Sequence, residues 1–471
     1  MGDSEVDEQV QAHFAAGVEA MRADDADAAL QAFRRVLALA PALPEAHVNL
    51  GLLLARRDPQ LSEQHYRQAI ASDPLRLEGY LQLGVLLAAN KRFAEAEFSY
   101  RQALAVEPAS PPALSNLGVL LASTGRTAQA VACYRAAIAI DPHYQPARFN
   151  WSYVLLRDGQ WAAGWREFEG RAWYAKFACH FDFPRWTGQP LAGTALLIVV
   201  EAGHGDMIQF CRYAQLARDA GAARIGLLCH AGLKRLFRSL AGVDVLYGVD
   251  EALPRDGWDY WAPPLSMPYR FGTELASVPA PLPYLAADCA DRARLGAPIR
   301  AAGAGMKVGL AWQGNPRFDN DADRSIASLA VLSPLAGVPG VRYFSLQKGA
   351  GELTAPGVDS AALPGLTDLA PLIADFADTA ALIAELDLVI AVDTAVAHLA
   401  GALGKPCWLL LPAYQPDWRW LTGRDDSPWY PGVMRLFRQH TAGDWPAVIE
   451  RVRAALTLHA EQDKSALSEK P

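Results

Sequence analysis

The first third of the chain repeats a pattern every 33 or 34 residues, and this period constrains the fold more than any other feature. One set of markers is glycine, at Gly17, Gly51, Gly84 and Gly118. A second set is proline, at Pro41, Pro74, Pro108 and Pro142. A repeat of this length holds one pair of helices, which buries its apolar face only by stacking on neighbouring pairs. The pattern therefore predicts an all-α helical solenoid.

Small and aromatic residues recur between these markers in the same phase. The small residues are Ala29, Ala96 and Ala130, where two helices are expected to approach closely. The aromatic residues are Phe33, Tyr66, Tyr100 and Tyr134, which are expected to fill the gap between neighbouring repeats. This combination resembles the tetratricopeptide family over Val10 to Pro142. A fifth, altered unit, Tyr144 to about Arg171, is expected to cap the array, so that repeats and cap span residues 10–175.

Asparagines occupy similar positions in the first helix of three units, at Asn49, Asn116 and Asn150. Solenoids of this kind present a concave face to extended peptides. One hypothesis is that the three amides bind a protein acceptor. The alternative is that they are ordinary polar surface residues.

Composition and charge narrow the classes of function. A chain of 471 residues is too long to fold around one hydrophobic core, so we expect several domains. The net charge is −8 and no long basic run occurs, so we expect no nucleic-acid partner. The acidic residues 1–9 do not form a secretory signal, and no apolar stretch reaches membrane-spanning length, which favours a cytoplasmic protein without a membrane span. Residues 1–9 and 459–471 are expected to be flexible. The six cysteines include no C-x-x-C pair and are expected to be reduced.

The repeat period ends near Pro184, and short apolar runs then alternate with amphipathic helices. This alternation predicts parallel sheets and an α/β fold. The expected strands are Ala195–Val200, Ile225–Cys229, Val243–Tyr247, Lys307–Trp312, Arg342–Gln347, Leu386–Val392 and Cys407–Leu411. A helix is expected at Met207–Ala220. The Gly- and Ala-rich stretch Gly296–Gly305 separates two Rossmann-type lobes, at 184–300 and 306–458, whose ligands should bind at the carboxyl ends of the strands.

A first candidate site is the loop Glu201–Asp206, which lies between a strand and a helix. Its glycines allow a ligand to approach the backbone closely. Asp206 also stands where an N-cap belongs, so capping of the helix is the alternative to a catalytic role.

A second candidate site follows the strand Leu386–Val392. Free amides and the positive end of a helix dipole at Thr394 and Ala395 suit a diphosphate, which the Thr394 hydroxyl could also bind. Asp393 is expected to orient or cap, because two anions repel each other. His398 shares a helix face with Thr394, and a buried, hydrogen-bonded core histidine is the alternative.

A third candidate site follows the first strand of the second lobe. The residues that could reach a nucleotide there are Trp312, Gly314, Asn315, Arg324 and, at the end of another strand, Gln347. The planar guanidinium of Arg324 could make two charge-assisted bonds to a leaving diphosphate, although a salt bridge to Asp321 or Asp323 is the alternative.

Two classes of site are not indicated by any motif. The chain has no HEXXH, no D-x-D and no clustered His and Asp set, so no metal is expected. It has no GxxxxGK[ST] loop, which argues against an ATPase or a kinase.

Six runs occur in an order that points to one family. These runs are Pro184–Gly188, Glu201–Phe210, Val308–Asn315, Asp378–Ala380, Val392–Gly401 and Asp426–Pro431. Together they resemble bacterial tetratricopeptide proteins that carry a heptosyltransferase-like glycosyltransferase region. The resemblance implies a GT-B pair of lobes and an inverting, metal-independent transfer from a nucleotide sugar, with no separate cofactor. It also implies that Asp206 is the catalytic base and that Asp393, Thr394 and His398 line the donor site.

The chain departs from that family just before Asp206. Relatives have glutamine where this chain has Ala202, and an apolar residue where it has His204. With an ordinary pKa near ~6.5, His204 could assist or replace Asp206 as the base. The lost amide could instead mark an altered acceptor or a weakened enzyme.

The leading prediction is a hexosyl- or heptosyltransferase-like enzyme whose acceptor is a protein held by the repeats. The main alternative is a non-catalytic adaptor with a degenerate glycosyltransferase region. Transfer to a lipid-linked sugar is a third alternative, weakened by the lack of a basic amphipathic face. The residues expected only to pack are Trp418, Arg419, Trp420, Trp429 and Tyr430.

Overall fold

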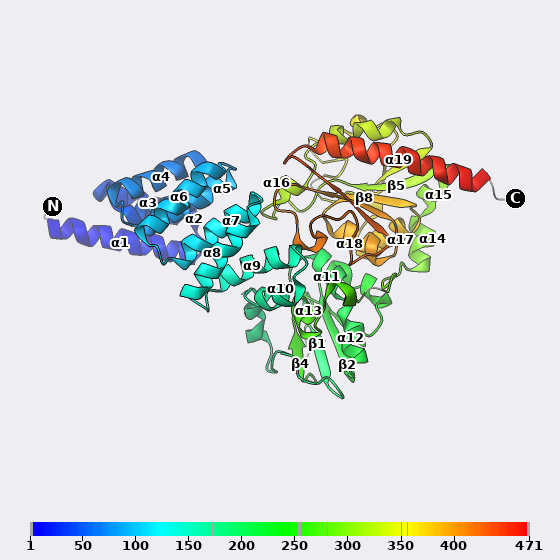
Figure 1. Cartoon of the computed structure of the whole chain (residues 1–471), viewed down its shortest axis with the longest axis horizontal. Coiled ribbons are helices and arrows are strands. Elements are labelled where there is room, and N and C mark those ends of the chain that lie inside the picture. The colour runs from blue at the N-terminus through cyan, green and yellow to red at the C-terminus, as the bar shows by residue number, and fades with distance from the viewer. Residues whose placement is uncertain are drawn as a thin grey trace. The chain divides into compact units, whose positions relative to one another are not determined.

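The contacts of the chain divide it into two units, Met1–Val154 and Leu155–Pro471, and each is described by itself. This computed structural model describes residues 3–171, 173–252, 256–279, 281–349, 351–355 and 357–468. Figure 1 shows the helices of the first unit in blue and cyan and the α/β elements of the second unit in green to red.

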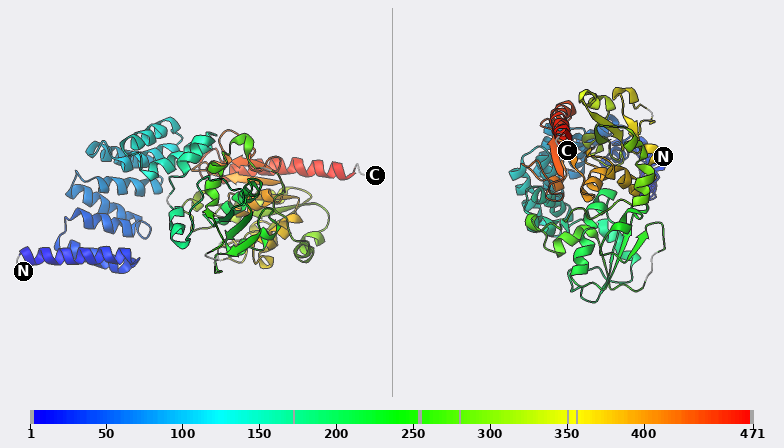
Figure 2. Two further views of the ribbon diagram at one scale, coloured as in Figure 1. Left: turned by 90° about the horizontal axis from the view of Figure 1, so that it is seen from below. Right: turned by 90° about the vertical axis from the view of Figure 1, so that its right-hand side faces the viewer.

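The first unit is a stack of antiparallel helix pairs. The pairs are α1 (Asp3–Arg22) with α2 (Ala26–Leu39), α3 (Pro44–Leu54) with α4 (Pro59–Ser72), α5 (Leu77–Ala89) with α6 (Phe93–Val106), and α7 (Pro111–Ser123) with α8 (Thr127–Ile140). Each marker proline follows the second helix of a pair, and the left view of Figure 2 shows the pairs side by side. The predicted helical solenoid is confirmed.

An aromatic ring over a glycine holds each pair together. A Cβ atom on Gly51 would lie 2.3 Å from the ring of Tyr66, and one on Gly84 would lie 2.4 Å from the ring of Tyr100. Each ring and its glycine belong to one pair, so the ring fills space within its own pair. Tyr66 also shares a core cluster with Leu81 of the next pair, as expected for a residue between repeats. Only glycine permits so close an approach of ring and helix.

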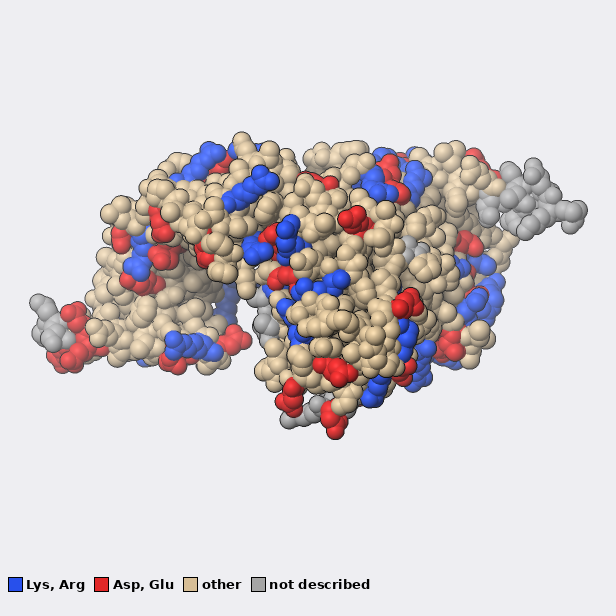
Figure 3. Space-filling model, turned by 60° about the horizontal axis from the view of Figure 1, so that its bottom comes forward, with Lys and Arg blue, Asp and Glu red and all other residues tan. Residues whose placement is uncertain are grey.

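Charged side chains connect successive pairs on the surface of this unit. Arg92 lies 2.5 Å from Glu63, and Arg126 lies 2.7 Å from Glu97. Figure 3 shows groups of basic and acidic side chains scattered over a surface of mostly uncharged residues. Such exposed pairs contribute little stability individually.

Both ends of the chain, expected to be flexible, are helical in the described residues. Helix α1 begins at Asp3, and Phe14 and Val18 pack against the core of the first pair. The last helix, α19 (Trp445–Ser468), buries Val448, Val452 and Leu456 on the second sheet. These three residues precede the stretch 459–471, of which Ala460 is 4% exposed and belongs to the same core. No described helix is long and apolar enough to cross a membrane.

The second unit contains two parallel sheets, which confirms the two-lobed, GT-B-like fold. The first sheet has the order β3-β2-β1-β4 and consists of β1 (Ala195–Ile198), β2 (Arg224–Cys229), β3 (Val245–Gly248) and β4 (Tyr260–Ala262). The second has the order β10-β9-β8-β5-β6-β7 and consists of β5 (Met306–Ala311), β6 (Val341–Ser345), β7 (Thr367–Asp368), β8 (Leu388–Val392), β9 (Cys407–Leu411) and β10 (Met434–Arg438).

The strand orders identify where each lobe binds ligands. In the second sheet the order reverses between β5 and β8, and in the first it reverses between β1 and β4. Loops beyond the carboxyl ends of strands at such a switch point form the ligand crevice of doubly wound sheets. The three candidate segments follow β1, β5 and β8, so all three lie at switch points.

The α-helices between α10 (Trp161–Phe168) and α19 are short. They are α11 (His204–Phe210), α12 (Tyr213–Asp219), α13 (Met267–Arg270), α14 (Cys289–Leu295), α15 (Ala297–Ala301), α16 (Asp321–Arg324), α17 (Phe376–Ala384) and α18 (Ala395–Ala402). The helix expected at Met207–Ala220 is thus divided into α11 and α12 and begins three residues earlier, so Asp206 lies in its first turn.

Helix α10 (Trp161–Phe168), expected to cap the repeats, belongs by its contacts to the second unit, because the boundary falls inside α9 (Gln145–Arg157). Trp161 stacks on Trp429 with ring centroids 5.2 Å apart, and Trp165 meets Trp418 edge-on at 5.1 Å. All four rings are at most 2% exposed. The prediction of a packing role for Trp418 and Trp429 matches these contacts.

Candidate functional site

Asp206 both caps a helix and remains accessible. Its Oδ2 accepts a hydrogen bond from the Gly203 amide at 2.8 Å, as in a capping box, while Oδ1 pairs with the guanidinium of Arg419. The side chain is 24% exposed. Each carboxylate oxygen carries two lone pairs, so capping leaves room for a proton. The capping alternative therefore describes a real contact and does not exclude a catalytic role.

Gly205 lies where α11 meets α18. A Cβ atom at this position would lie 2.9 Å from Cδ2 of His398 and 3.5 Å from the Cα of Ala395. Glycine thus lets the first turn of α11, which carries Asp206, touch the first turn of α18. The two candidate segments that follow β1 and β8 are brought together at this contact.

Thr394 offers an unused hydroxyl at the start of α18. Its Oγ1 is buried and has no hydrogen-bond partner within the protein. The residue has the extended N-cap conformation, yet its side chain does not cap the helix. A buried polar atom without a partner is costly, and a bound anion would satisfy it together with the free amides of α18.

Asp393 is held by an indole from the same lobe. Its Oδ2 accepts a hydrogen bond from Nε1 of Trp420 at 2.9 Å. Burial, reinforced by the nearby negative charge of Asp417, raises the pKa of Asp393 to about 6. These contacts fit an orienting role for this carboxyl better than direct contact with phosphate.

His398 is a buried, hydrogen-bonded histidine, as the more conservative interpretation held. It is 6% exposed, its Nδ1 lies 2.8 Å from the Tyr430 hydroxyl, and its ring stacks on Trp420. Burial, followed by the positive charge of Arg419, holds the pKa of His398 well below its usual value, so the ring is neutral. Its Cδ2 edge faces Gly205.

Arg324 lies within electrostatic reach of Asp393 and His398. Its positive charge acts on Asp393 and on His398, in each case lowering the pKa. Its Nε donates to Asp321 at 3.0 Å, so the predicted salt bridge to that residue exists, and the side chain is 16% exposed. A Cβ atom on Gly314 would lie 2.8 Å from Nη2 of Arg324, which explains the glycine.

Three residues expected at the nucleotide are engaged elsewhere. Trp312 is 1% exposed and belongs to the core of the second lobe. The Gln347 side chain accepts from the amides of Trp312 and Gln313, each at 2.9 Å, and donates to the Gln313 carbonyl. Asn315 accepts from the amide of Arg317 at 3.0 Å. Trp312 and Gln347 thus support the loop after β5 from behind, which corrects the expectation that their side chains face a ligand.

His204 is stacked between two rings. Its centroid lies 4.2 Å from that of His230 and 5.1 Å from that of Phe376, which belongs to α17 of the other lobe. Burial and the neighbouring His230 lower the pKa of His204 to about 4. The preceding Ala202 has φ 59°, a left-handed conformation that is costly for a residue other than glycine. The loop that departs from the family is therefore strained.

Three site residues were missed at the sequence level because they were expected only to pack. Arg419 pairs with Asp206, Trp420 with Asp393, and Tyr430 with His398. The available signal was a dense run of aromatic and basic residues carrying polar atoms. Only the fold reveals that this run returns to the crevice.

The three asparagines proposed for acceptor binding lie in the first unit. Asn49, Asn116 and Asn150 are half-buried on α3, α7 and α9. The amide of Asn150 donates to Ser115 Oγ at 3.3 Å, so it is partly engaged within the unit.

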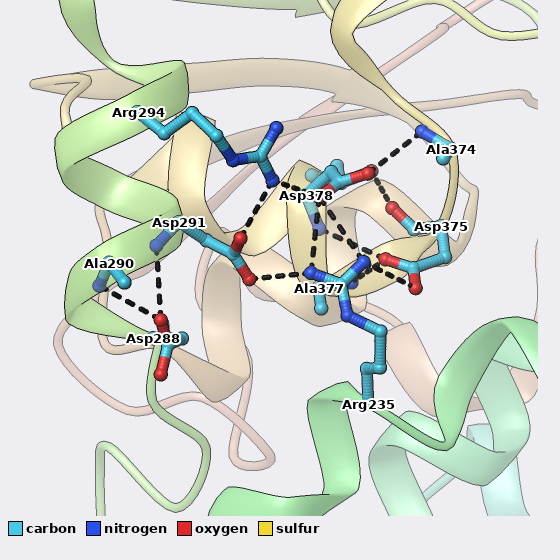
Figure 4. A network of polar contacts seen from close by, with 10 residues as sticks. Arg235, Asp288, Ala290, Asp291, Arg294, Ala374, Asp375, Ala377 and Asp378 are labelled. Carbon is cyan, nitrogen blue, oxygen red and sulfur yellow. Dashed lines mark hydrogen bonds and ion pairs between the residues drawn. The ribbon is translucent and has the colours of Figure 1, made fainter.

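A charge network joins the two lobes (Figure 4). Arg235, from the first lobe, lies 2.8 Å from Asp375 and 3.3 Å from Asp378 of the second lobe, and 2.5 Å from Asp291 of α14. Arg294 also contacts Asp291, at 2.7 Å. In the described part of the chain, no group of three or more His, Cys, Asp or Glu residues gathers as a metal site.

Comparison with known families gives separate matches for the helical repeats and for the α/β unit. Residues 14–74, 52–100 and 87–150 match tetratricopeptide repeats. Residues 356–411 match glycosyltransferase family 9 (heptosyltransferase), a segment that contains β8, α18 and β9. This chain joins tetratricopeptide repeats to a heptosyltransferase-like region. The match to the heptosyltransferase family includes Asp393, Thr394 and His398.

A curated relative matches more than half of the chain. Protein FlbA of Caulobacter vibrioides is 31% identical over 325 residues, which are 63% of this chain and 52% of that protein. The chain therefore spans about half the length of this relative.

Solved structures resemble the chain less closely. A structure of PilF from Pseudomonas aeruginosa is 18% identical, covering 46% of this chain and 88% of that one with a TM-score of 0.35. A thermophilic tetratricopeptide protein of Thermus thermophilus is 21% identical, covering 36% of this chain and 94% of that one with a TM-score of 0.33.

Proposed function

We propose that the heptosyltransferase-like region transfers a sugar from a nucleotide-sugar donor, with inversion and without a metal, to a protein held by the repeats. One observation carries this proposal. The close contact at Gly205 brings the accessible carboxylate of Asp206 to the same helix start as the unpaired hydroxyl of Thr394. A base and an anion cradle in contact are what a single displacement requires.

The donor diphosphate would bind at the start of α18. Thr394 would donate its hydroxyl, the first amides of the helix would donate their N–H groups, and Arg324 would supply the positive charge. Asp393, oriented by Trp420, would hold the loop in place rather than touch the phosphate.

The reaction would proceed in one step. Asp206 takes the proton from an acceptor hydroxyl, and that oxygen forms a bond to the anomeric carbon. The bond from this carbon to the diphosphate oxygen breaks on the opposite face, and the nucleoside diphosphate leaves with the bonding electrons. Arg324 and the α18 amides stabilise the charge that develops on the leaving group.

His204 is the second candidate base. Its two ring faces are occupied by His230 and Phe376, so only its edge can approach an acceptor. Asp206, which is held by contacts to both of its oxygens, is better oriented for the same task.

The repeats would supply the acceptor. Tetratricopeptide arrays bind extended peptides, and Asn49, Asn116 and Asn150 recur at equivalent positions of their first helices. Loss of acceptor binding on replacement of all three with alanine, with donor binding unchanged, would support this part of the proposal.

A non-catalytic adaptor is the alternative, and the departures at Ala202 and His204 favour it. The strained Ala202 and the His204 ring stacked on Phe376 both lie in the loop that leads to Asp206. An adaptor would bind its partner through the repeats and release no nucleotide from any sugar nucleotide.

The test begins with thermal-shift titrations of the full chain with UDP, GDP, ADP, CMP and dTDP. We expect a rise in Tm with one of them that is lost in Arg324→Ala and kept in Arg342→Ala, an exposed arginine at the start of β6. The corresponding sugar nucleotide is then tested for turnover. If none of the five nucleotides raises the Tm, or if no sugar nucleotide is turned over, the proposal that the chain is an enzyme is contradicted.

A further inference from the structure

Arg419 connects the two lobes at the proposed base. It lies in the short helix η9 (Trp418–Trp420), which follows β9 in the second lobe. Its guanidinium pairs with Asp206 and donates from Nε to Oε1 of Gln209 at 2.6 Å. Asp206 and Gln209 both belong to α11 of the first lobe. Arg419 of the second lobe thus contacts two residues of α11, the helix that carries the proposed base.

The orientation of Arg419 is set by its own segment. Nη1 donates to both carboxylate oxygens of Asp417, at 3.0 and 2.9 Å. The guanidinium carbon lies 4.4 Å from the ring centroid of Trp418 and 5.5 Å from that of Phe210. The side chain is only 7% exposed. A planar fork enclosed in this way presents its remaining N–H groups in one direction.

The consequence for Asp206 is a fixed carboxylate. Arg419 holds Oδ1, and the amide of Gly203 holds Oδ2. Two contacts to different oxygens, one of them charge-assisted, fix the orientation of the carboxylate plane. The side chain is 24% exposed, which leaves room for an acceptor hydroxyl to approach it.

We propose that Arg419 is a positioning residue for Asp206, so that the catalytic base is complete only when the second lobe lies against the first. This inference rests on the proposed function. The base comes from the first lobe, whereas its orienting cation and the donor-binding helix α18 come from the second. Closure of the lobes around the donor would therefore orient the base in the same movement.

The experiment uses the full chain and the sugar nucleotide identified above. We expect Arg419→Ala to lower kcat by about 100-fold, with the KM for the donor nearly unchanged, because the base loses its orientation while the phosphate contacts remain. Added guanidinium ion at millimolar concentration should restore part of this loss. Arg424→Ala is the matched control, since Arg424 lies in the same segment and pairs with Asp426 at 2.6 Å, away from Asp206.

A double variant separates positioning from a structural role. If Arg419 acts through Asp206, then Arg419→Ala should cost little further activity in an Asp206→Asn background. The proposal would be overturned if Arg419→Ala cost as much activity in the Asp206→Asn background as in the wild type. It would also be overturned if guanidinium ion failed to rescue Arg419→Ala.

Two further outcomes are decisive. Should Arg419→Ala fail to fold, Arg419→Lys keeps the charge but not the planar fork, and a normal kcat in that variant would overturn the positioning role. A reduced kcat with a normal Tm would support it. If the wild-type chain turns over no sugar nucleotide, the proposed function itself fails, which is a different result from turnover that does not depend on Arg419.

Discussion

Thr394 combines a functional position with an energetic cost. Its buried Oγ1 has no partner, so valine, which has the same shape without the hydroxyl, removes a penalty of about 1 kcal/mol. We expect Thr394→Val to raise the free energy of unfolding of the unliganded chain and to weaken nucleotide binding about 10-fold. Urea unfolding and thermal-shift titration measure the two effects.

The control for Thr394→Val is a threonine whose hydroxyl is satisfied. Thr379 in α17 is 4% exposed and donates to the Asp375 carbonyl at 3.2 Å. Thr379→Val should lower the free energy of unfolding slightly and leave nucleotide binding unchanged. Lower stability of unliganded Thr394→Val would mean that its hydroxyl has a partner after all.

The carboxyl of Asp393 makes stability depend on pH. Because burial raises its pKa from 3.8 to about 6, the folded state binds more protons than the unfolded state between these values. Its contribution to the free energy of unfolding therefore falls as pH rises through this window. Relative to wild type, Asp393→Asn should become more stable from pH 4 to pH 7 in urea titrations.

The carboxyl of Asp426 makes the free energy of unfolding depend on pH in the opposite direction. The hydrogen bond from Arg424 holds the pKa of Asp426 below its usual value, so its stabilisation is present above that value and lost on acidification. Asp426→Asn should therefore lose stability relative to wild type as pH rises up to its usual pKa of 3.8, a window below that of Asp393, and the difference should be constant above it. Parallel pH curves for both variants would contradict both assignments.

Gly205 is a residue whose missing side chain matters. A methyl group there would meet His398, whose ring is fixed by Tyr430 and Trp420. We expect Gly205→Ala to lower the free energy of unfolding by about 1–3 kcal/mol and to reduce turnover, because α11 must move away from α18. Gly337→Ala is the control, since nothing lies within 4 Å of its added Cβ. Equal effects of the two changes would show that close approach at Gly205 is unimportant.

At the scale of elements, α10 is part of the core of the α/β unit. Trp165 is 2% exposed, and its indole donates to the Thr273 carbonyl at 2.9 Å. Trp165→Ala should lower the free energy of unfolding by about 3–5 kcal/mol, measured by urea unfolding of the full chain. Phe98→Ala, at a ring 66% exposed on α6, should change it by less than about 0.5 kcal/mol. Comparable losses would contradict the role of α10.

Most elements could be predicted from the sequence because their patterns are local. The 34-residue period fixes the helix pairs, and continuous apolar runs mark β1, β5, β8 and β9. Strands β4, β7 and β10 are short or interrupted by polar residues, which hides them in such patterns. The C-terminal helix was overlooked because its apolar residues are separated by charged ones.

The part of the candidate site that lies next to strand ends could also be predicted from the sequence. Asp206, Thr394 and His398 stand next to strand ends, where a doubly wound sheet directs its ligand loops. The orientation of Gln347 and the role of Arg419 depend on contacts between segments far apart in the chain. No local pattern encodes such contacts.

At the scale of the whole α/β unit, the network around Arg235 connects the two lobes. Asp378, 3% exposed, would lose one of its two arginine partners in Arg235→Gln. We expect the Tm to fall, with a smaller difference at high salt, since the Arg235 side chain is 37% exposed and its pairs are screened. Arg300→Gln, at an exposed pair with Glu385 outside this network, is the control. A salt-independent loss would point to packing rather than charge.

The segment from Asp417 to Tyr430 follows β9 in the second lobe, yet Arg419 and Trp429 make their main contacts with α10 and α11. Suppose that the lobes of two related proteins were exchanged with a single crossover in the linker Gly296–Gly305. The segment 417–430 would then come from one parent, and the helices α10 and α11 that it contacts would come from the other. The exchangeable piece is therefore discontinuous: α10, the first lobe and this returning segment must come from the same parent.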